Sequence, residues 1–271
     1  MNINKKDRPI GVFDSGVGGL TVLKEIIREL PHESTIYLGD TARVPYGIRS
    51  SETVIRYSFE NTKFLSSKDI KLLVIACNTA SSVSLDLIKN SVSIPVIGVI
   101  EPGAKAAVKS TKNKKIGVIG TEATVKSNAY TKAIKAIDES IEIFSLACPL
   151  FVPLVEEGWT EGDIAAMIAV QYLNSLKAEG IDTIVLGCTH YPLLKKVITE
   201  VMGEDVILID SAVETSLEIK SILEVLGLNR GPEAIPFNKF YVTDSPERFL
   251  KVGENFLGQK IEQIEKIVVG G

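Results

Sequence analysis

The chain carries the same short signature twice. In residues 72–81 and 184–192, an apolar, strand-like run leads through a small residue to a cysteine, and polar residues expected to open a helix follow. The two cysteines are 111 positions apart, and a second pair of segments, residues 10–15 and 116–121, repeats at an interval of 106. Repetition at a nearly constant interval indicates an internal duplication. We therefore expect two similar halves that share one cleft.

Apolar runs rich in Val and Ile alternate with helical patterns along almost the whole chain, which predicts βαβ units with mainly parallel sheets. The predicted strands are residues 10–13, 35–38, 72–76, 95–99, 116–119, 141–146, 184–186, 206–209 and 240–242. The predicted helices are residues 20–30, 51–65, 163–176, 193–201 and 211–226, with a further helix after residue 242. The expected fold class is α/β: two doubly wound domains related by pseudo-symmetry, with the active site in the cleft between them.

The segment after residue 210 has no counterpart in the duplication, so we expect it to return to the first half. The first domain would then be discontinuous and comprise residues 1–98 and 211–271. The second domain would comprise residues 99–210.

Composition excludes several classes of protein. The net charge is −4 and no basic stripe is present, which argues against a nucleic-acid partner. No apolar run approaches the roughly 18 residues that span a bilayer, and the N-terminus lacks the apolar segment of a signal peptide. The three cysteines form neither a disulfide framework nor a zinc-binding spacing. We expect a cytoplasmic protein with reduced thiols, no metal and no membrane partner.

The cysteines differ in their surroundings. Cys148, flanked by apolar residues and followed by Pro149, is predicted to lie in the core. Cys77 and Cys188 are followed by Asn-Thr and Thr-His, polar groups suited to a helix N-terminus that lines a cleft. The helix dipole there would lower the pKa of each thiol. In doubly wound sheets, ligands bind at the carboxyl ends of the strands, where both cysteines fall.

Two kinds of chemistry fit these thiols. Cys188 and His190 could form the nucleophile and base of a cysteine hydrolase, but that leaves Cys77 unexplained. Proton transfer at a carbon acid uses both thiols, because one thiolate removes the α-proton while the opposite thiol protonates the other face. The duplication would then mirror a nearly symmetric reaction.

Carboxylates and imidazole are expected to assist the two thiols. Asp14, which ends the first strand, is placed to assist Cys77, with a helix N-cap as its alternative role. His190 would serve the second thiol. Glu156 is a further candidate on the same side, although Glu157 lies next to it.

The glycine-rich segment after Asp14 matches neither the Rossmann spacing nor a Walker loop. We expect Gly16, Gly18 and Gly19 to let backbone N–H groups approach a carboxylate. Neutral donors at the equivalent strand ends would complete a site for a small dicarboxylate: Ser15, Asn78, Thr79, Thr121, Thr124 and Thr189.

Taken together, these residues resemble the glutamate racemases, cofactor-independent enzymes of the aspartate/glutamate racemase superfamily. Five motifs carry the resemblance over nearly the whole chain, at residues 13–20, 45–47, 76–80, 120–124 and 187–192. The resemblance implies that Cys77 takes the α-proton of D-glutamate and Cys188 that of L-glutamate. It implies that Asp14, His190 and Glu156 assist them. The substrate contacts that it implies are Asp14, Ser15, Tyr46, Gly47, Asn78, Thr79, Thr121, Thr124, Thr189 and His190.

The same resemblance implies a homodimer that supplies D-glutamate to peptidoglycan synthesis without pyridoxal phosphate or metal. An aspartate racemase shares the thiol chemistry, but the motifs at residues 14–19 and 45–47 favour the longer substrate. Decarboxylases of the superfamily use a single cysteine. A binding protein for acidic amino acids remains the alternative from a different class.

Overall fold

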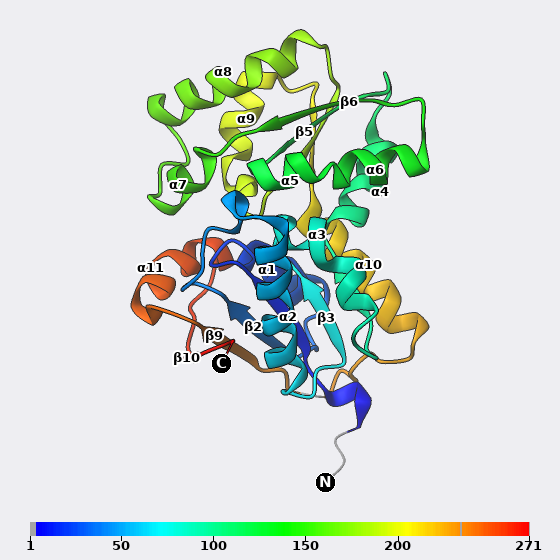
Figure 1. The fold of residues 1–271 in the computed structure, drawn as a ribbon, viewed down its shortest axis with the longest axis vertical. Coiled ribbons are helices and arrows are strands. Elements are labelled where there is room, and N and C mark those ends of the chain that lie inside the picture. Colours follow the sequence, from blue (N-terminus) through cyan, green and yellow to red (C-terminus); the bar gives the residue numbers. More distant parts are fainter. Residues whose placement is uncertain (1–3, 234, 271) are drawn as a thin grey trace.

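The computed structural model describes residues 4–233 and 235–270. Two α/β layered halves lie one above the other, and the first and last described elements, η1 (Lys5–Asp7) and β10, both lie on the half that contains β1 (Figure 1). Each half is built around a parallel sheet. The predicted α/β class with two sheets is therefore confirmed.

The first sheet has six parallel strands in the order β10-β9-β2-β1-β3-β4. The strands are β1 (Ile10–Asp14), β2 (Thr35–Gly39), β3 (Leu72–Ile75), β4 (Val96–Gly98), β9 (Asn238–Val242) and β10 (Ile264–Lys266). All residues of β1 to β4 are buried, because helices cover both faces. Full burial explains why these strands read as continuous apolar runs rather than alternating ones.

The second sheet has four parallel strands in the order β6-β5-β7-β8. They are β5 (Lys115–Gly120), β6 (Glu142–Ala147), β7 (Thr183–Gly187) and β8 (Ile207–Asp210). Counted from the first strand of each half, β1 to β4 and β5 to β8 have the same spatial order, 2-1-3-4. This shared order is the pseudo-symmetry that the duplicated motifs predict.

The helices of the first half are α1 (Leu20–Glu29), α2 (Ser51–Ser66), α3 (Asn78–Lys89), α10 (Ser211–Val225) and α11 (Pro246–Leu257), with 3-10 helices η1 (Lys5–Asp7) and η2 (Tyr46–Ile48). Those that follow β4 and surround the second sheet are α4 (Ile100–Ser110), α5 (Glu122–Ser127), α6 (Ala129–Ile137), α7 (Phe151–Glu156), α8 (Asp163–Ala178), η3 (Tyr191–Leu194) and α9 (Lys195–Met202). Local signals define several ends: Ser50 accepts a hydrogen bond from Thr53 N at the start of α2, and Asp210 accepts one from Ala212 N at the start of α10.

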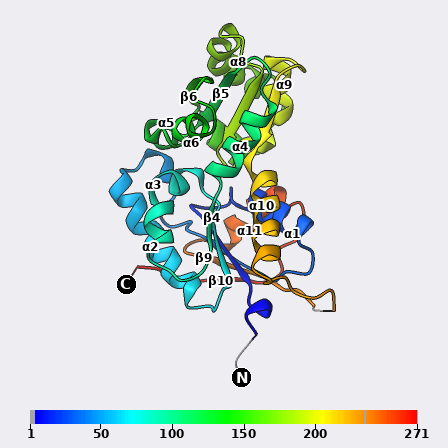
Figure 2. The same cartoon turned by 90° about the vertical axis from the view of Figure 1, so that its right-hand side faces the viewer.

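The chain crosses between the halves twice, through α4 and at the start of α10, and these two helices pack together (Figure 2). Strands β9 and β10 add to the edge of the first sheet, so the C-terminal segment does pair with the first half. The domain boundaries near residues 98 and 210 stay predictions. Among the described residues, no helix is both long and apolar enough to cross a membrane.

Candidate active site

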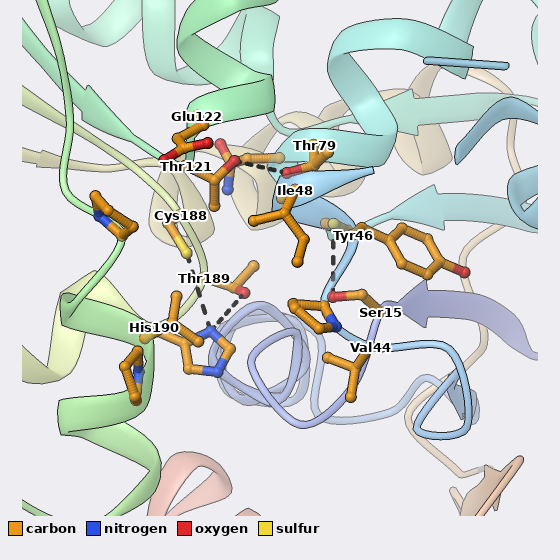
Figure 3. Close-up of a pocket in the computed structure, with 17 residues that line it drawn as sticks. Ser15, Val44, Tyr46, Ile48, Thr79, Thr121, Glu122, Cys188, Thr189 and His190 are labelled. Carbon is orange, nitrogen blue, oxygen red and sulfur yellow. Dashed lines mark hydrogen bonds between the residues drawn. The ribbon is translucent and has the colours of Figure 1, made fainter. Parts of the chain in front are cut away.

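A cavity of about 140 Å³ lies at the carboxyl ends of the strands, between the two halves. Cys77 follows β3 and Cys188 follows β7, strands that occupy equivalent places in the two sheets, and both thiols line the cavity. In Figure 3, Cys188 and His190 lie on one side and Ser15, Val44 and Tyr46 on the other. The cavity is smaller than the roughly 300–1,000 Å³ of drug-sized ligand sites, so its size suits a small molecule.

Most of the predicted site residues line this cavity. Those that do are Ser15, Tyr46, Gly47, Cys77, Asn78, Thr79, Thr121, Cys188, Thr189 and His190. Asp14, Thr124 and Glu156 lie outside the lining. Thr124 and Glu156 form hydrogen bonds with lining residues, and Asp14 acts on Cys77 through its charge. The lining residues that sequence reasoning missed are Val44, Pro45, Ile48, Glu122, Pro149, Val152 and Pro153. The duplication could have pointed to six of these residues. The segments that follow β2 and β6 occupy equivalent places in the two halves, and both contribute to the wall of the cavity.

Cys77 is the N-cap of α3, as predicted, and its Sγ accepts a hydrogen bond of 3.5 Å from Ala80 N. The predicted consequence for its acidity is wrong. Burial raises the pKa of Cys77 to about 12, and the Asp14 carboxylate adds to the rise, whereas the contacts with Ala80 and Ser15 oppose it only in part. Desolvation of a thiolate outweighs one helix terminus here. In this structure, therefore, Cys77 carries its proton at neutral pH.

Asp14 is fully buried behind Cys77. Its Oδ2 accepts a hydrogen bond of 2.9 Å from Gly16 N, and Oδ1 has no partner among the described residues. The alternative role as a helix N-cap is wrong, since the N-cap of α1 is Gly19. Burial raises the pKa of Asp14, and the charge of His190 opposes that rise. A buried carboxyl with one free oxygen beside a thiol is a group that can exchange protons with it.

Cys188 does not begin an α-helix, which corrects a second prediction. It lies in a bend, and the 3-10 helix η3 follows, with Pro192 near its start. The polar neighbour of its thiol is instead His190, whose Nδ1 is 3.9 Å from Sγ. On the other side of the ring, Nε2 is 3.2 Å from Glu156 Oε1. Glu157, the neighbouring candidate, is exposed at the end of α7.

The electrostatics of this second thiol differ from those of the first. Burial would lower the pKa of His190, but its hydrogen bonds with Cys188 and Glu156 outweigh burial and raise that pKa to about 10. The hydrogen bond with His190 in turn holds the pKa of Glu156 below its usual range. A charged imidazole at this place can donate a hydrogen bond to the Cys188 sulfur.

Three hydroxyl groups join the halves at the cavity wall. Thr79 on α3 lies 2.9 Å from Thr121 and 3.1 Å from Thr124, and the last two lie 3.0 Å apart, oxygen to oxygen. We call these residues the threonine ring. Beside it, Tyr130 donates to Asn78 Oδ1 at 2.7 Å, which leaves the buried Asn78 Nδ2 without a partner among the described residues. A buried amide donor at a cavity wall is suited to an acceptor on a ligand.

The segment that carries Tyr46 and Gly47 is held by a buried carboxylate. Asp40 accepts hydrogen bonds from the Tyr46 hydroxyl, from Arg43 Nε at 2.7 Å and from Thr243 Oγ1 at 3.0 Å. Its side chain is fully buried. This network fixes one wall of the cavity relative to β2 and β9.

None of the three glycines of the glycine-rich segment lines the cavity, and the Gly16 N–H donates to the Asp14 carboxylate; their approach to a substrate carboxylate stays a prediction. A Cβ atom at Gly18 would lie 2.2 Å from Thr189 Oγ1 and 2.5 Å from His190 Nδ1. A Cβ atom at Gly19 would lie 2.5 Å from Asp14 Cβ. Gly18 and Gly19 therefore allow the first half to pack directly against the residues that surround the thiols.

The chain is similar to known proteins over almost its whole length. Residues 10–215 match the model of the Asp/Glu/Hydantoin racemase family. The chain is 55% identical over 260 residues to the glutamate racemase of Geobacter metallireducens, with 96% of each chain covered. It matches the crystal structure of a glutamate racemase isoform from Bacillus anthracis with a TM-score of 0.93 at 46% identity, covering 97% of this chain and 98% of that one.

A further match is the crystal structure of the Francisella tularensis glutamate racemase in complex with D-glutamate. Its TM-score is 0.92 at 40% identity, and 97% of this chain and 98% of that one are covered. Such agreement in sequence and fold over almost the full length shows that the chain belongs to the Asp/Glu/Hydantoin racemase family, among its glutamate racemases.

Proposed function

We propose that this protein interconverts L- and D-glutamate by proton transfer between two cysteines. The observation that carries the proposal is that Cys77 and Cys188 line one small cavity from equivalent strands of the two halves. Glutamate as the substrate is supported by the relatives named glutamate racemase and by the D-glutamate complex of the Francisella tularensis protein.

The reaction needs one thiolate and one thiol. In the direction from L to D, the Cys188 thiolate takes the α-proton of L-glutamate and becomes a thiol. The electron pair left on the α-carbon then takes the proton of the Cys77 thiol from the opposite face, and Cys77 becomes a thiolate. The reverse reaction exchanges the two roles, so atoms and charge balance without any further reactant.

The electrostatics favour one starting state. Burial keeps the proton on Cys77, and the Cys188 thiol lies 3.9 Å from Nδ1 of the charged His190. A protonated Cys77 is the proton donor that the direction from L to D requires. His190 and Glu156 assist Cys188, and Asp14 with its raised pKa exchanges protons with Cys77.

The proposed substrate contacts combine the residues of the cavity with two residues behind it. They are Asp14, Ser15, Tyr46, Gly47, Asn78, Thr79, Thr121, Thr124, Thr189 and His190. The proposal also includes a cytoplasmic homodimer that needs no cofactor and whose D-glutamate enters peptidoglycan synthesis.

The test is to incubate the purified protein, freed of pyridoxal phosphate, with L-glutamate in deuterated water. Optical rotation and deuterium at the α-carbon are followed by NMR for the wild type, Cys77→Ser and Cys188→Ser. Cys148→Ser is the matched control, because Cys148 is a buried cysteine outside the cavity. We expect racemisation with α-deuterium in the wild type and the control, and loss of turnover in both other variants.

Each contrary result points to a different function. Full activity of Cys77→Ser would contradict the two-thiol mechanism and favour a nucleophile at Cys188. Binding of glutamate with no change in rotation or label would contradict racemisation of this substrate.

A further inference from the structure

Arg248 connects a distant helix to the candidate active site. It lies on α11, in the segment that returns to the first half, and its Nη2 is 3.4 Å from Glu156 Oε2 on α7. The other oxygen of the same carboxylate, Oε1, is 3.2 Å from His190 Nε2. His190 Nδ1 is 3.9 Å from Cys188 Sγ. Contacts therefore run without interruption from α11 to the thiol.

Glu156 needs such a partner because water reaches it. Its side chain is 21% exposed and faces a second cavity, of about 280 Å³, that is separate from the one between the thiols. A carboxylate with water on one side can turn away from an imidazole, and one fixed partner for each oxygen prevents that rotation. Arg248 and Phe249 of α11 form part of the wall of this second cavity.

We propose that Arg248 is a positioning residue: it holds Glu156 against His190 and thereby keeps His190 in contact with Cys188. The inference rests on the proposed function, in which Cys188 is a base. It adds that α11, which follows the second half in the chain, completes the environment of a thiol in that half.

The neighbouring charges are consistent with this role. The groups that face the imidazole are Cys188, Glu156 and the buried Asp14, and Phe256 of α11 packs edge-on at 5.1 Å between ring centroids. The other acidic group of the second cavity, Asp244, is paired with Lys266 at 2.8 Å. It therefore does not compete strongly for Arg248.

Two effects of Arg248 on the imidazole oppose each other. Its positive charge disfavours a protonated His190, whereas a fixed Glu156 favours one. We expect the second effect to dominate, because the Arg248 side chain is 67% exposed and water screens its charge, while Glu156 touches the ring directly. Removal of Arg248 should therefore make Cys188 less reactive.

The experiment measures thiol reactivity rather than turnover. The intact protein is alkylated with iodoacetamide at pH 7, and the rates at Cys77 and Cys188 are measured separately by mass spectrometry of the peptides. The variants are Arg248→Gln, Arg248→Lys as the rescue, and Lys196→Gln as the matched control. Lys196 is an exposed cation paired with Glu161 at 2.7 Å, away from both cavities.

In Arg248→Gln we expect alkylation of Cys188 to slow by about twofold to fivefold, which is the fold-change that corresponds to the loss of one exposed ion pair. The rate should recover in Arg248→Lys. Cys77 should be unaffected in every variant, and Lys196→Gln should match the wild type. An unchanged or faster rate at Cys188, or an equal slowing at Cys77, would overturn the inference. A wild type that does not racemise glutamate would instead refute the proposed function, while the ratio of alkylation rates would still decide the role of Arg248.

Discussion

Gly18→Ala should slow catalysis by about 100-fold in a protein that still folds. A Cβ atom at this position would lie 2.5 Å from both Cε1 and Nδ1 of His190 and 2.2 Å from Thr189 Oγ1. Non-bonded carbon contacts have their optimum at about 3.5–4.0 Å, so one of the partners must shift by about 1 Å.

The surrounding bonds decide which partner shifts. The carbonyl oxygen of Gly18 accepts hydrogen bonds from the Thr21 backbone at 3.0 Å and from the Thr21 hydroxyl at 2.9 Å. The same hydroxyl lies 3.0 Å from the carbonyl oxygen of Thr189. Both backbones are thus tied to α1, so the side chains of Thr189 and His190 must give way, and the imidazole is pushed out of its place beside Cys188.

A displacement of about 1 Å at a catalytic group costs on the order of 100-fold in rate. Overpacking of a buried site costs about 1–3 kcal/mol of the free energy of unfolding. The assay measures kcat for L-glutamate by α-deuterium exchange and unfolding by urea titration. Gly16→Ala is the control, because a Cβ atom there would lie 3.5 Å from Val44, an ordinary contact in the same loop. If Gly18→Ala kept kcat within threefold of Gly16→Ala, the reasoning would be refuted.

Three further changes test other parts of the structure. The raised pKa of His190 means that its contribution to the free energy of unfolding is complete below pH 6.5 and is lost as pH rises towards about 10. Urea titrations between pH 6.5 and pH 10 should show this decline in stability in the wild type. A decline of equal slope in His190→Asn would contradict it. Lys71→Met should lower the free energy of unfolding by about 3–5 kcal/mol, because it removes the buried partner of Glu33 and leaves that carboxylate without an ion pair. A loss under 1 kcal/mol in a urea titration would count against the buried Lys71–Glu33 pair. Asp40→Asn should raise KM for glutamate more than it lowers kcat, because the Tyr46 wall loosens while the thiols stay in place, and steady-state kinetics showing the reverse would reject that role.

The fold could be predicted from the sequence because burial leaves a simple signal. Buried parallel strands read as Val and Ile runs, and the sequence predicts nine of the ten strands found among the described residues. The tenth, β10, is a three-residue edge strand whose last two residues, Glu265 and Lys266, are exposed, so it lacks that apolar signal. Short helices such as α5 and α7, each of six residues, are too brief to show periodicity.

The identity of the candidate site residues could also be predicted, but their electrostatics could not. The motif around Cys77 predicts a helix N-terminus, yet the pKa of the thiol depends on burial and on Asp14, which is 63 positions away in the chain. The Cys188 motif looks the same in sequence, but Pro192 and a 3-10 turn replace the helix. Arg248 carries no motif, because its relevance arises only from a side-chain contact between α11 and Glu156 of α7.

The threonine ring has a consequence for how tightly a ligand can be held. Three hydroxyls supply three protons, and the ring already contains three oxygen–oxygen contacts. A carboxylate that binds there gains each hydrogen bond only when a hydrogen bond within the ring is broken. The net gain in binding free energy is therefore small. Such a surface recognises a carboxylate by shape and by donor position rather than by strong attraction. For an enzyme whose reactant and product differ only in handedness, weak retention lets either enantiomer leave as readily as it enters.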